Sequence, residues 1–275
     1  MAAVEERLLD AARGGRVADV VSLLRNNPGL DVNCADNRKR TALHFASLSD
    51  HVEVVKLLLA QPRIRVNLKN AGEKTPFFLA CEYHMMSVVK LLSKDPRISV
   101  TLDSDGRTPL WRASYIGWHE VVEWLIASGR DLGDVSNTKG RTWNGKKLTA
   151  LEIAKEEGKS RVVTLLERFL ANPEEIRHEL RVKLGVLDEL AAEVFALTIF
   201  LCDDLLQLNP ALASSASDPD DIHFFAISKR LPMELQMVLC YRVAGSMKQN
   251  ILRKDSEPAF KSLARALLLA PSTKR

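Results

Sequence analysis

The 275-residue chain lacks the segments that mark membrane-spanning or secreted proteins. Its most apolar stretch, Leu190 to Cys202, contains Glu193 and ends after 13 residues, whereas a membrane-spanning helix needs about 20. The N-terminal segment MAAVEERLLD carries early acidic residues and has no apolar core of the kind that a signal peptide needs. We therefore expect an intracellular protein, cytoplasmic or nuclear, with no membrane span.

Paired cysteines and histidine motifs are also missing. The four cysteines (Cys34, Cys81, Cys202 and Cys240) form no Cys-x-x-Cys pair, so the sequence predicts neither a zinc site nor a disulfide framework. None of the six histidines stands at the spacing of a nucleophile, a metal site or a phosphate-binding loop. We expect no catalytic residue, no metal and no cofactor, and therefore a protein that is not an enzyme.

What the sequence does contain is one phrase repeated four times. TALHFA begins at Thr41, TPFFLA at Thr75, TPLWRA at Thr108 and TALEIA at Thr149, so the threonines are 34, 33 and 41 residues apart. Ten residues after each threonine, an apolar segment of the type HVEVVKLL begins. A period near 33 residues indicates stacked units, each of which cannot bury its apolar face alone.

A fifth, degenerate copy lies 34 residues upstream of the first phrase. Its apolar positions align with those of the next copy, and Asn33 aligns with Asn67, but Arg7 stands where the threonine belongs. An atypical first unit is expected at the end of a stack, because its outer face meets water instead of a neighbour.

These units resemble ankyrin repeats. The resemblance covers roughly Glu6 to Asn172, within a repeat domain of residues 1–172, as five repeats at about 7–40, 41–74, 75–107, 108–148 and 149–172. It implies an all-α solenoid of stacked helix-turn-helix units with short finger loops. It also implies a scaffold that binds a protein partner.

The resemblance further indicates which residues contact the partner. In ankyrin repeats these lie in the fingers before each threonine and just after the alanine of TPLHxA, on the concave face. The corresponding residues are Arg38, Arg40, Lys74 and Arg107 in the fingers, and Leu48, Glu82, Tyr83, Tyr115 and Ile116 on the helices. Because the fingers are mainly basic, we expect an acidic or phosphorylated partner. The alternative for Leu48 and Ile116 is that they complete the core.

The fourth finger is the largest, as the 41-residue spacing requires. Its Asn144-Gly145 pair predicts a two-residue hairpin turn, because both residues tolerate positive φ. Trp143 stands beside this turn. The tryptophan either anchors a partner, since aromatic contacts dominate interface energetics, or folds back onto its own finger.

Two positions predict backbone strain. Asp50 and His84 stand between the paired helices where Gly117 and Gly158 stand in the later copies, so each is expected to be left-handed, at a cost of about 1 kcal/mol. At the family's histidine position only the first phrase has a histidine, His44. We expect a structural role for it instead of general-base catalysis.

The remainder of the chain is predicted to be helical but not repetitive. Two helices, Glu174 to Lys183 and about Gly185 to Gln207, are expected to cap the last repeat within residues 173–209, before a small-residue, acidic linker at 210–221. Residues 222–275 form a basic C-terminal helical subdomain with ten Lys or Arg against three Asp or Glu, a surplus of seven. No aromatic stacking motif accompanies these charges, which argues against direct nucleic-acid binding.

Within this tail, LPMELQMVLCYRV resembles the first helix of an F-box, the segment that docks on the Skp adaptor of a ubiquitin ligase. The resemblance implies adaptor contacts for Leu231, Pro232, Leu235 and Leu239, and hence a substrate-recruiting adaptor of such a ligase. An F-box usually continues with a tryptophan-containing helix, whereas all four tryptophans here lie in the repeats. The alternative is a helical subdomain that packs on the solenoid or mediates other contacts.

Overall fold

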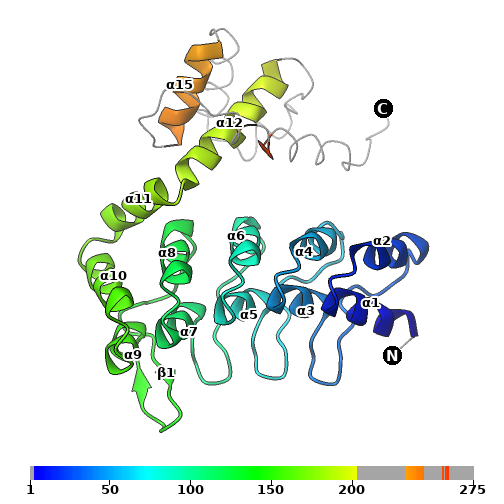
Figure 1. The fold of residues 1–275 in the computed structure, drawn as a ribbon, viewed down its shortest axis with the longest axis horizontal. Coiled ribbons are helices and arrows are strands. Elements are labelled where there is room, and N and C mark those ends of the chain that lie inside the picture. The colour runs from blue at the N-terminus through cyan, green and yellow to red at the C-terminus, as the bar shows by residue number, and fades with distance from the viewer. Residues whose placement is uncertain (1–2, 203–232, 245–255, 257, 260–275) are drawn as a thin grey trace, which may run out of the picture. The chain divides into compact units, whose positions relative to one another are not determined.

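The computed structural model describes residues 3–202, 233–244, 256 and 258–259 (Figure 1). The chain divides into two compact units, Met1–Leu180 and Arg181–Arg275. The first unit holds all the repeated phrases, and the second holds part of the C-terminal helical region.

The first unit is built from helix pairs stacked side by side, with the first helices in one row and the second helices in another (Figure 1). The first helices are α1 (Ala3–Arg13), α3 (Ala42–Leu48), α5 (Pro76–Glu82), α7 (Pro109–Ile116) and α9 (Ala150–Glu156). The second helices are α2 (Val17–Asn26), α4 (Val52–Leu59), α6 (Met86–Lys94), α8 (His119–Ser128) and α10 (Ser160–Ala171). Each helix contacts its own partner and the equivalent helix of the next pair, which confirms the predicted helical solenoid.

The repeated threonine starts the first helix of the last four pairs. Thr41, Thr75, Thr108 and Thr149 are N-caps whose hydroxyl accepts a hydrogen bond from the backbone N–H three residues later. This bond satisfies one of the N–H groups that the first turn of a helix leaves unpaired. The helix starts are therefore determined locally by the phrase itself.

Left-handed residues join the two helices of each pair. The φ values are +64° at Gly15, +53° at Asp50, +59° at His84, +95° at Gly117 and +65° at Gly158. The prediction for Asp50 and His84 is confirmed. Asp50 also has a second role, because its Oδ1 accepts a hydrogen bond from the backbone N–H of Val88 at 3.0 Å, in the first turn of the next second helix.

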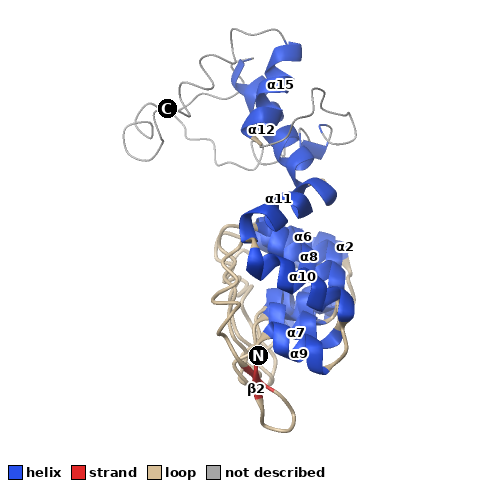
Figure 2. Ribbon diagram, turned by 90° about the vertical axis from the view of Figure 1, so that its left-hand side faces the viewer, coloured by secondary structure: helices blue, strands red, loops and turns tan. Residues whose placement is uncertain are grey.

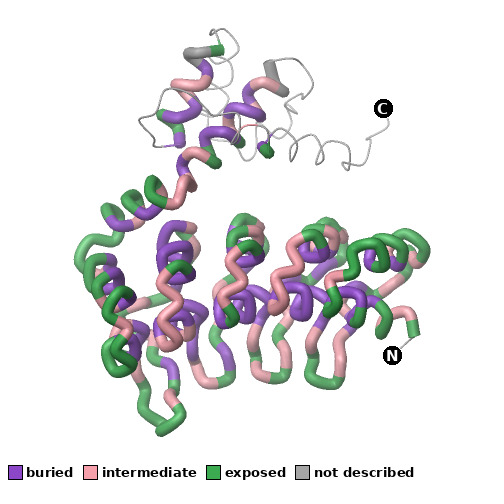
Figure 3. Tube along the Cα trace, in the orientation of Figure 1, coloured by how far each residue is buried: buried purple, intermediate pink, exposed green. Residues whose placement is uncertain are grey.

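The core lies between the two rows of helices and between neighbouring pairs (Figure 3). Small side chains let the helices approach closely, since Ala46, Ala80, Ala113 and Ala154 are completely buried. The cysteines Cys34, Cys81 and Cys240 are buried thiols outside any disulfide, and burial raises the pKa of the Cys34 thiol to about 11.

Two asparagines connect successive repeats in a way that the sequence analysis did not anticipate. Asn33 donates to the carbonyl of Arg63 at 2.9 Å and accepts from the N–H of Arg65 at 2.8 Å. Asn67 repeats this arrangement one unit later, donating to the carbonyl of Arg97 at 2.6 Å and accepting from Ser99 N–H at 3.0 Å. These side chains support the longer, proline-led linkers of the second and third repeats. The 34-residue spacing of the two asparagines was the available signal.

The loops before the threonines project on one side of the helices (Figure 2). In the first three, Asp36, Asn70 and Asp103 each accept hydrogen bonds from the backbone N–H groups two and four residues later. The fourth is a hairpin, as predicted, with β1 (Gly140–Arg141) pairing antiparallel with β2 (Lys147–Leu148). The prediction of a two-residue turn is wrong, because the closing bond from Thr142 to Lys146 leaves three residues between them, and only Gly145 has a positive φ, at +81°. One backbone hydrogen bond joins each finger to the next, namely Ala71 to Arg38, Ser104 to Gly72 and Arg141 to Asp105.

Beyond α10, the chain continues into α11 (Pro173–Lys183), which crosses the boundary between the two units. The part of α11 that belongs to the first unit contacts the last repeat. Arg168 on α10 forms an ion pair with Glu179 at 2.5 Å, and the Arg177 guanidinium lies 5.9 Å from the centre of the Phe169 ring.

In the described part of the second unit, α12 (Val186–Cys202) packs against α15 (Met233–Val243). Ala191 on α12 packs against Tyr241 and Ala244, while Ala192 and Ala196 pack against Ala259. No helix in the part of the chain that the structure describes is long and apolar enough to cross a membrane. The predicted end of the long helix after Cys202 and the predicted linker at 210–221 lie outside the described residues.

Candidate partner-binding surface

The family's histidine position holds successive repeats together. His44 is fully buried, its Nδ1 lies 3.1 Å from the backbone N of Thr41, and its Nε2 lies 3.1 Å from the carbonyl oxygen of Lys74. Because a carbonyl only accepts, Nε2 carries the proton and Nδ1 accepts from the Thr41 N–H. Burial lowers the pKa of His44 to about 4, so the ring is neutral near pH 7.

Trp111, at the same position two repeats later, also bonds to the carbonyl of the residue before the next threonine. Its Nε1 donates to the carbonyl of Leu148 at 2.7 Å, and Leu148 directly precedes Thr149 just as Lys74 precedes Thr75. Glu152, at this position in the last phrase, makes the other bond of His44, because it accepts from the N–H of its own capping threonine, Thr149, at 2.8 Å. His44 therefore has the structural role that was expected for it, and Trp111 and Glu152 each make one of its two bonds in later repeats.

A cation stands directly before each of the first three threonines and lies over an aromatic ring of the helix that this threonine starts. The distances to the ring centre are 4.6 Å for Arg40 with Phe45, 5.4 Å for Lys74 with Phe78 and 5.3 Å for Arg107 with Trp111. Each of these cations also has an anionic neighbour, which is Asp36 at 2.7 Å, Glu82 at 2.8 Å and Asp105 at 3.0 Å respectively. All three predicted contact residues thus make internal contacts at the base of a finger.

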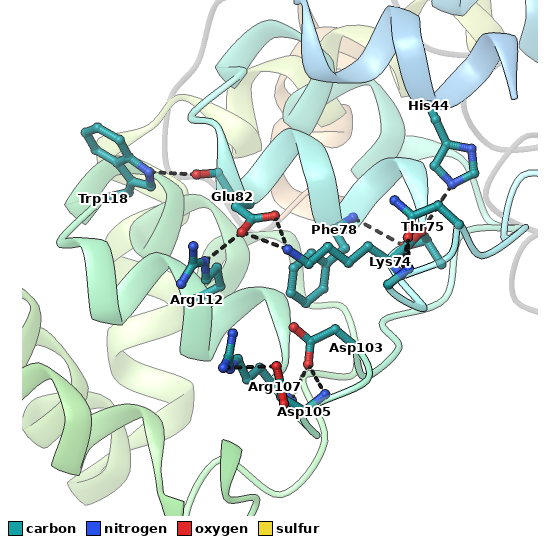
Figure 4. Close-up of polar contacts among 12 residues, drawn as sticks. His44, Lys74, Thr75, Phe78, Glu82, Asp103, Asp105, Arg107, Arg112 and Trp118 are labelled. Atoms are coloured by element: carbon teal, nitrogen blue, oxygen red, sulfur yellow. Dashed lines mark hydrogen bonds and ion pairs between the residues drawn. The ribbon is translucent and has the colours of Figure 1, made fainter. Parts of the chain in front are cut away.

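Glu82 is the centre of a polar cluster between the second and third phrases (Figure 4). We call Lys74, Glu82 and Arg112 the Glu82 cluster. The carboxylate is only 5% exposed and accepts from Lys74 Nζ at 2.8 and 2.9 Å and from Arg112 Nε at 2.7 Å. The backbone carbonyl of Glu82 accepts from Trp118 Nε1 at 3.0 Å. A buried carboxylate needs such partners, because removing a charge from water without them is costly.

The fourth finger is attached rigidly at its base. Arg107 Nε donates to the carbonyl of Arg141 at 2.7 Å, which adds to the bond from Trp111 to Leu148. Gly140 sits so close to this pair that an added Cβ would lie 2.7 Å from Arg107 Cγ and 3.0 Å from Trp111. Only glycine fits there, and the hairpin is held against the Trp111 indole.

The predicted residues with exposed side chains occur at separate places on the repeat unit. Trp143 is 85% exposed at the tip of the fourth finger, so it does not fold back onto that finger. Tyr83 is 52% exposed at the end of α5, and Arg38 is exposed in the first finger. The half-buried residues are Leu48, Tyr115 and Ile116, and Tyr115 stacks on Trp111 with ring centres 5.7 Å apart.

Comparison with family models gives the identity of the repeats. The model described as ankyrin repeats (3 copies) matches residues 8–102 and 77–174, which together span more than half of the 275 residues. The chain belongs to the ankyrin-repeat family. No curated protein matches it. Its ankyrin repeats indicate that it is a protein–protein interaction module, and the family is generally non-enzymatic.

The ankyrin repeats contain a candidate binding residue that the sequence analysis missed. Arg112 occupies a position where the other copies have the apolar residues Phe45, Leu79 and Ile153, which are all buried. Its departure from the repeat pattern was the signal that could have identified it.

The F-box-like residues are only partly described. Leu231 and Pro232 lie outside the described residues, as does the side chain of Leu235. Leu239 lies on α15 and is half-buried. Among the described side chains, the buried ones are Gln236, Cys240 and Tyr241 on this helix and Ala244 directly after it. Met233 and Val243 are exposed, so α15 has apolar side chains outside its contact with α12.

Proposed function

We propose that this ankyrin-repeat protein is a scaffold that binds a partner protein through the concave face and the fingers of its repeats. The observation that carries the proposal is that large aromatic side chains, Trp143 and Tyr83, are exposed on a framework whose finger residues are bonded to one another. A preformed surface loses little conformational entropy when it binds, and exposed aromatic residues supply the contact area.

The exposed charges support an acidic partner. Arg40, Lys74 and Arg107 each have an anionic neighbour, but Arg38 and Lys39 in the first finger and Arg141 and Lys147 in the fourth are exposed. Arg141 and Lys147 are directly opposite each other in the hairpin and so lie on one face of it. Positive charge at both ends of the row of fingers would favour the approach of an acidic or phosphorylated surface.

We also propose that the protein has no catalytic activity and functions inside the cell. The neutral, buried His44 supports the first point, because both of its ring nitrogens are used in structural hydrogen bonds, with the Thr41 N–H and with the Lys74 carbonyl. The reduced, buried thiols Cys34, Cys81 and Cys240 support the second, because intracellular compartments keep cysteines reduced.

The double substitution of Tyr83→Ala and Tyr115→Ala tests the main proposal. Affinity purification from the source cell with the full chain should recover a partner, and the double variant should recover at least about tenfold less, as expected for loss of interface aromatics. The matched control is Val17→Ala with Val21→Ala, which removes exposed apolar side chains from α2. Equal recovery by all three proteins, or a melting temperature that falls in step with recovery, would contradict the proposal.

A second candidate is the ubiquitin-ligase adaptor role, which the exposed Met233 and Val243 on α15 favour. In this case the full chain should co-purify the Skp adaptor. Replacing Leu231 and Pro232 with alanine should abolish the interaction and leave partner capture by the repeats unchanged. A wild-type chain that does not co-purify the adaptor would overturn this candidate.

A further inference from the structure

Arg112 is bonded at one end of its guanidinium and open at the other. Its Nε donates to Glu82, and its Cζ lies 5.2 Å from the centre of the Tyr115 ring. Among the described residues, Nη1 and Nη2 make no hydrogen bond, and neither is one of the buried unpaired polar atoms. Both nitrogens therefore reach solvent from a side chain that is only 19% exposed.

The charge of the Glu82 cluster does not balance. Lys74 and Arg112 are two cations that share one carboxylate, which leaves a surplus of one positive charge. Both cations are partly buried, at 24% and 19% exposed. Partly buried charges are screened less by water and salt than exposed ones, so this surplus attracts an anion more strongly than a surface lysine would.

Two other arginines of the repeats have no such open end. Arg40 lies over Phe45 much as Arg112 lies over Tyr115, but both its Nε and its Nη2 contact Asp36, at 2.8 and 2.7 Å. Arg107 uses Nε for the Arg141 carbonyl and Nη2 for Asp105. Arg112 is therefore held in position by Glu82 and the Tyr115 ring while its two terminal nitrogens make no hydrogen bond.

We propose that Arg112 binds the carboxylate of an aspartate or glutamate side chain of the partner protein, an inference that rests on the proposed function of the repeats. The planar guanidinium can donate two parallel hydrogen bonds from its terminal nitrogens to one carboxylate. Glu82 and the Tyr115 ring hold the guanidinium in place, so little side-chain entropy is lost on binding. A single negative charge matches the surplus of the Glu82 cluster.

The test uses a random dodecamer peptide library displayed on phage and selected on the immobilised full chain. Wild-type protein should enrich peptides with an aspartate or glutamate at one fixed position. Arg112→Gln should lower the affinity for such a peptide about tenfold or more, the usual effect of losing a charge-assisted hydrogen bond. Replacing that aspartate or glutamate of the peptide with asparagine or glutamine should lower the affinity of the wild type by the same factor. It should not lower the affinity of the Arg112→Gln variant any further.

Arg177→Gln is the matched control, because Arg177 is also a partly buried arginine that lies over an aromatic ring and pairs with a glutamate, but it stands on α11, outside the fingers and the first helices. It should leave affinity unchanged. If Arg112→Gln fails to fold, Arg112→Lys keeps the charge but not the paired donors, and it should still weaken binding several-fold. Peptides selected without acidic residues, but dependent on Tyr83 and Tyr115, would overturn the role of Arg112 and leave the proposed function standing. A wild-type chain that selects no peptide over the bare support would overturn both.

Discussion

At the level of single residues, equivalent positions of the repeats make different contacts. His44 and Trp111 donate ring N–H groups to the carbonyl before the next threonine, whereas Phe78 at the same position has no ring donor. Arg112 stands where the other copies bury an apolar side chain. Residues that hold the repeats together and residues available to a partner thus occupy the same helices.

The buried His44 makes stability depend on pH. Burial lowers its pKa to about 4, below the value of about 6.5 in an unfolded chain, so only the unfolded state gains this proton as the pH falls from 7 to 5. Its contribution is fully present above pH 6.5 and is lost as the pH falls toward 4. We expect the free energy of unfolding to fall by about 2 kcal/mol more between pH 7 and pH 5 in the wild type than in His44→Phe.

Urea unfolding at the two pH values measures this difference. The lowered pKa values of Asp36 and Asp95 affect stability mainly below about pH 4, so they do not interfere in this range. The same loss in both proteins would show that His44 is not the group responsible.

The left-handed joints between helices give a second prediction at this scale. Gly158 has a φ of +65° and Gly29 does not lie in the left-handed region, yet a Cβ at either position would meet no atom within 4 Å. Gly158→Ala should therefore lower the free energy of unfolding by about 1 kcal/mol through backbone strain alone, while Gly29→Ala should not lower it. Thermal unfolding of both variants checks this. An equal effect at the two sites would contradict the account of the joints.

At the scale of elements, the fourth finger depends on Trp111. The hairpin rests on the indole through Gly140 and receives the bond from Nε1 to Leu148, while Tyr115 stacks on the same ring system. One side chain therefore links the exposed Trp143 finger to the helix that carries Tyr115 and Arg112.

Trp111→Phe should loosen this finger while the solenoid stays folded, because Phe78 occupies the equivalent position one repeat earlier. We expect faster amide hydrogen exchange at Thr142 and Gly145 and a loss of about 1 kcal/mol in stability, the net value of one hydrogen bond. Trp124→Phe, which loses the bond from Nε1 to Ser93 at 2.9 Å, is the control and should leave the finger unchanged. Equal exchange in both variants would show that Trp111 does not hold the hairpin.

The elements also show how far the sequence could predict this structure. The threonine phrases, the left-handed Asp50 and His84, and the hairpin at Asn144-Gly145 are local patterns, and these are confirmed. Only the length of the hairpin turn is wrong, since it has three residues instead of two. The internal pairing of Arg40, Lys74 and Arg107 was not predicted, because it depends on which anionic group lies beside each cation after folding. The terminal nitrogens of Arg112 that make no hydrogen bond were not predicted for the same reason, because no sequence pattern marks an unpaired guanidinium end.

At the scale of the whole molecule, the chain combines a rigid repeat unit with a second, smaller helical unit. The repeats are joined by helix packing, by the asparagine bonds of the linkers and by one backbone bond between successive fingers. Such a stack presents a preformed surface, and the proposed function requires that this surface, and not the outer row of second helices, meets the partner.

Site-specific photo-crosslinking shows which of these two surfaces meets the partner. A photoreactive amino acid replaces Tyr83 at the end of a first helix in one protein and the exposed Val21 on the second helix α2 in another. We expect the residue 83 probe to crosslink a partner and to lose most of this crosslink when Arg112→Gln is added. The residue 21 probe should give no crosslink. A partner crosslinked from residue 21 and never from residue 83 would contradict the proposed function.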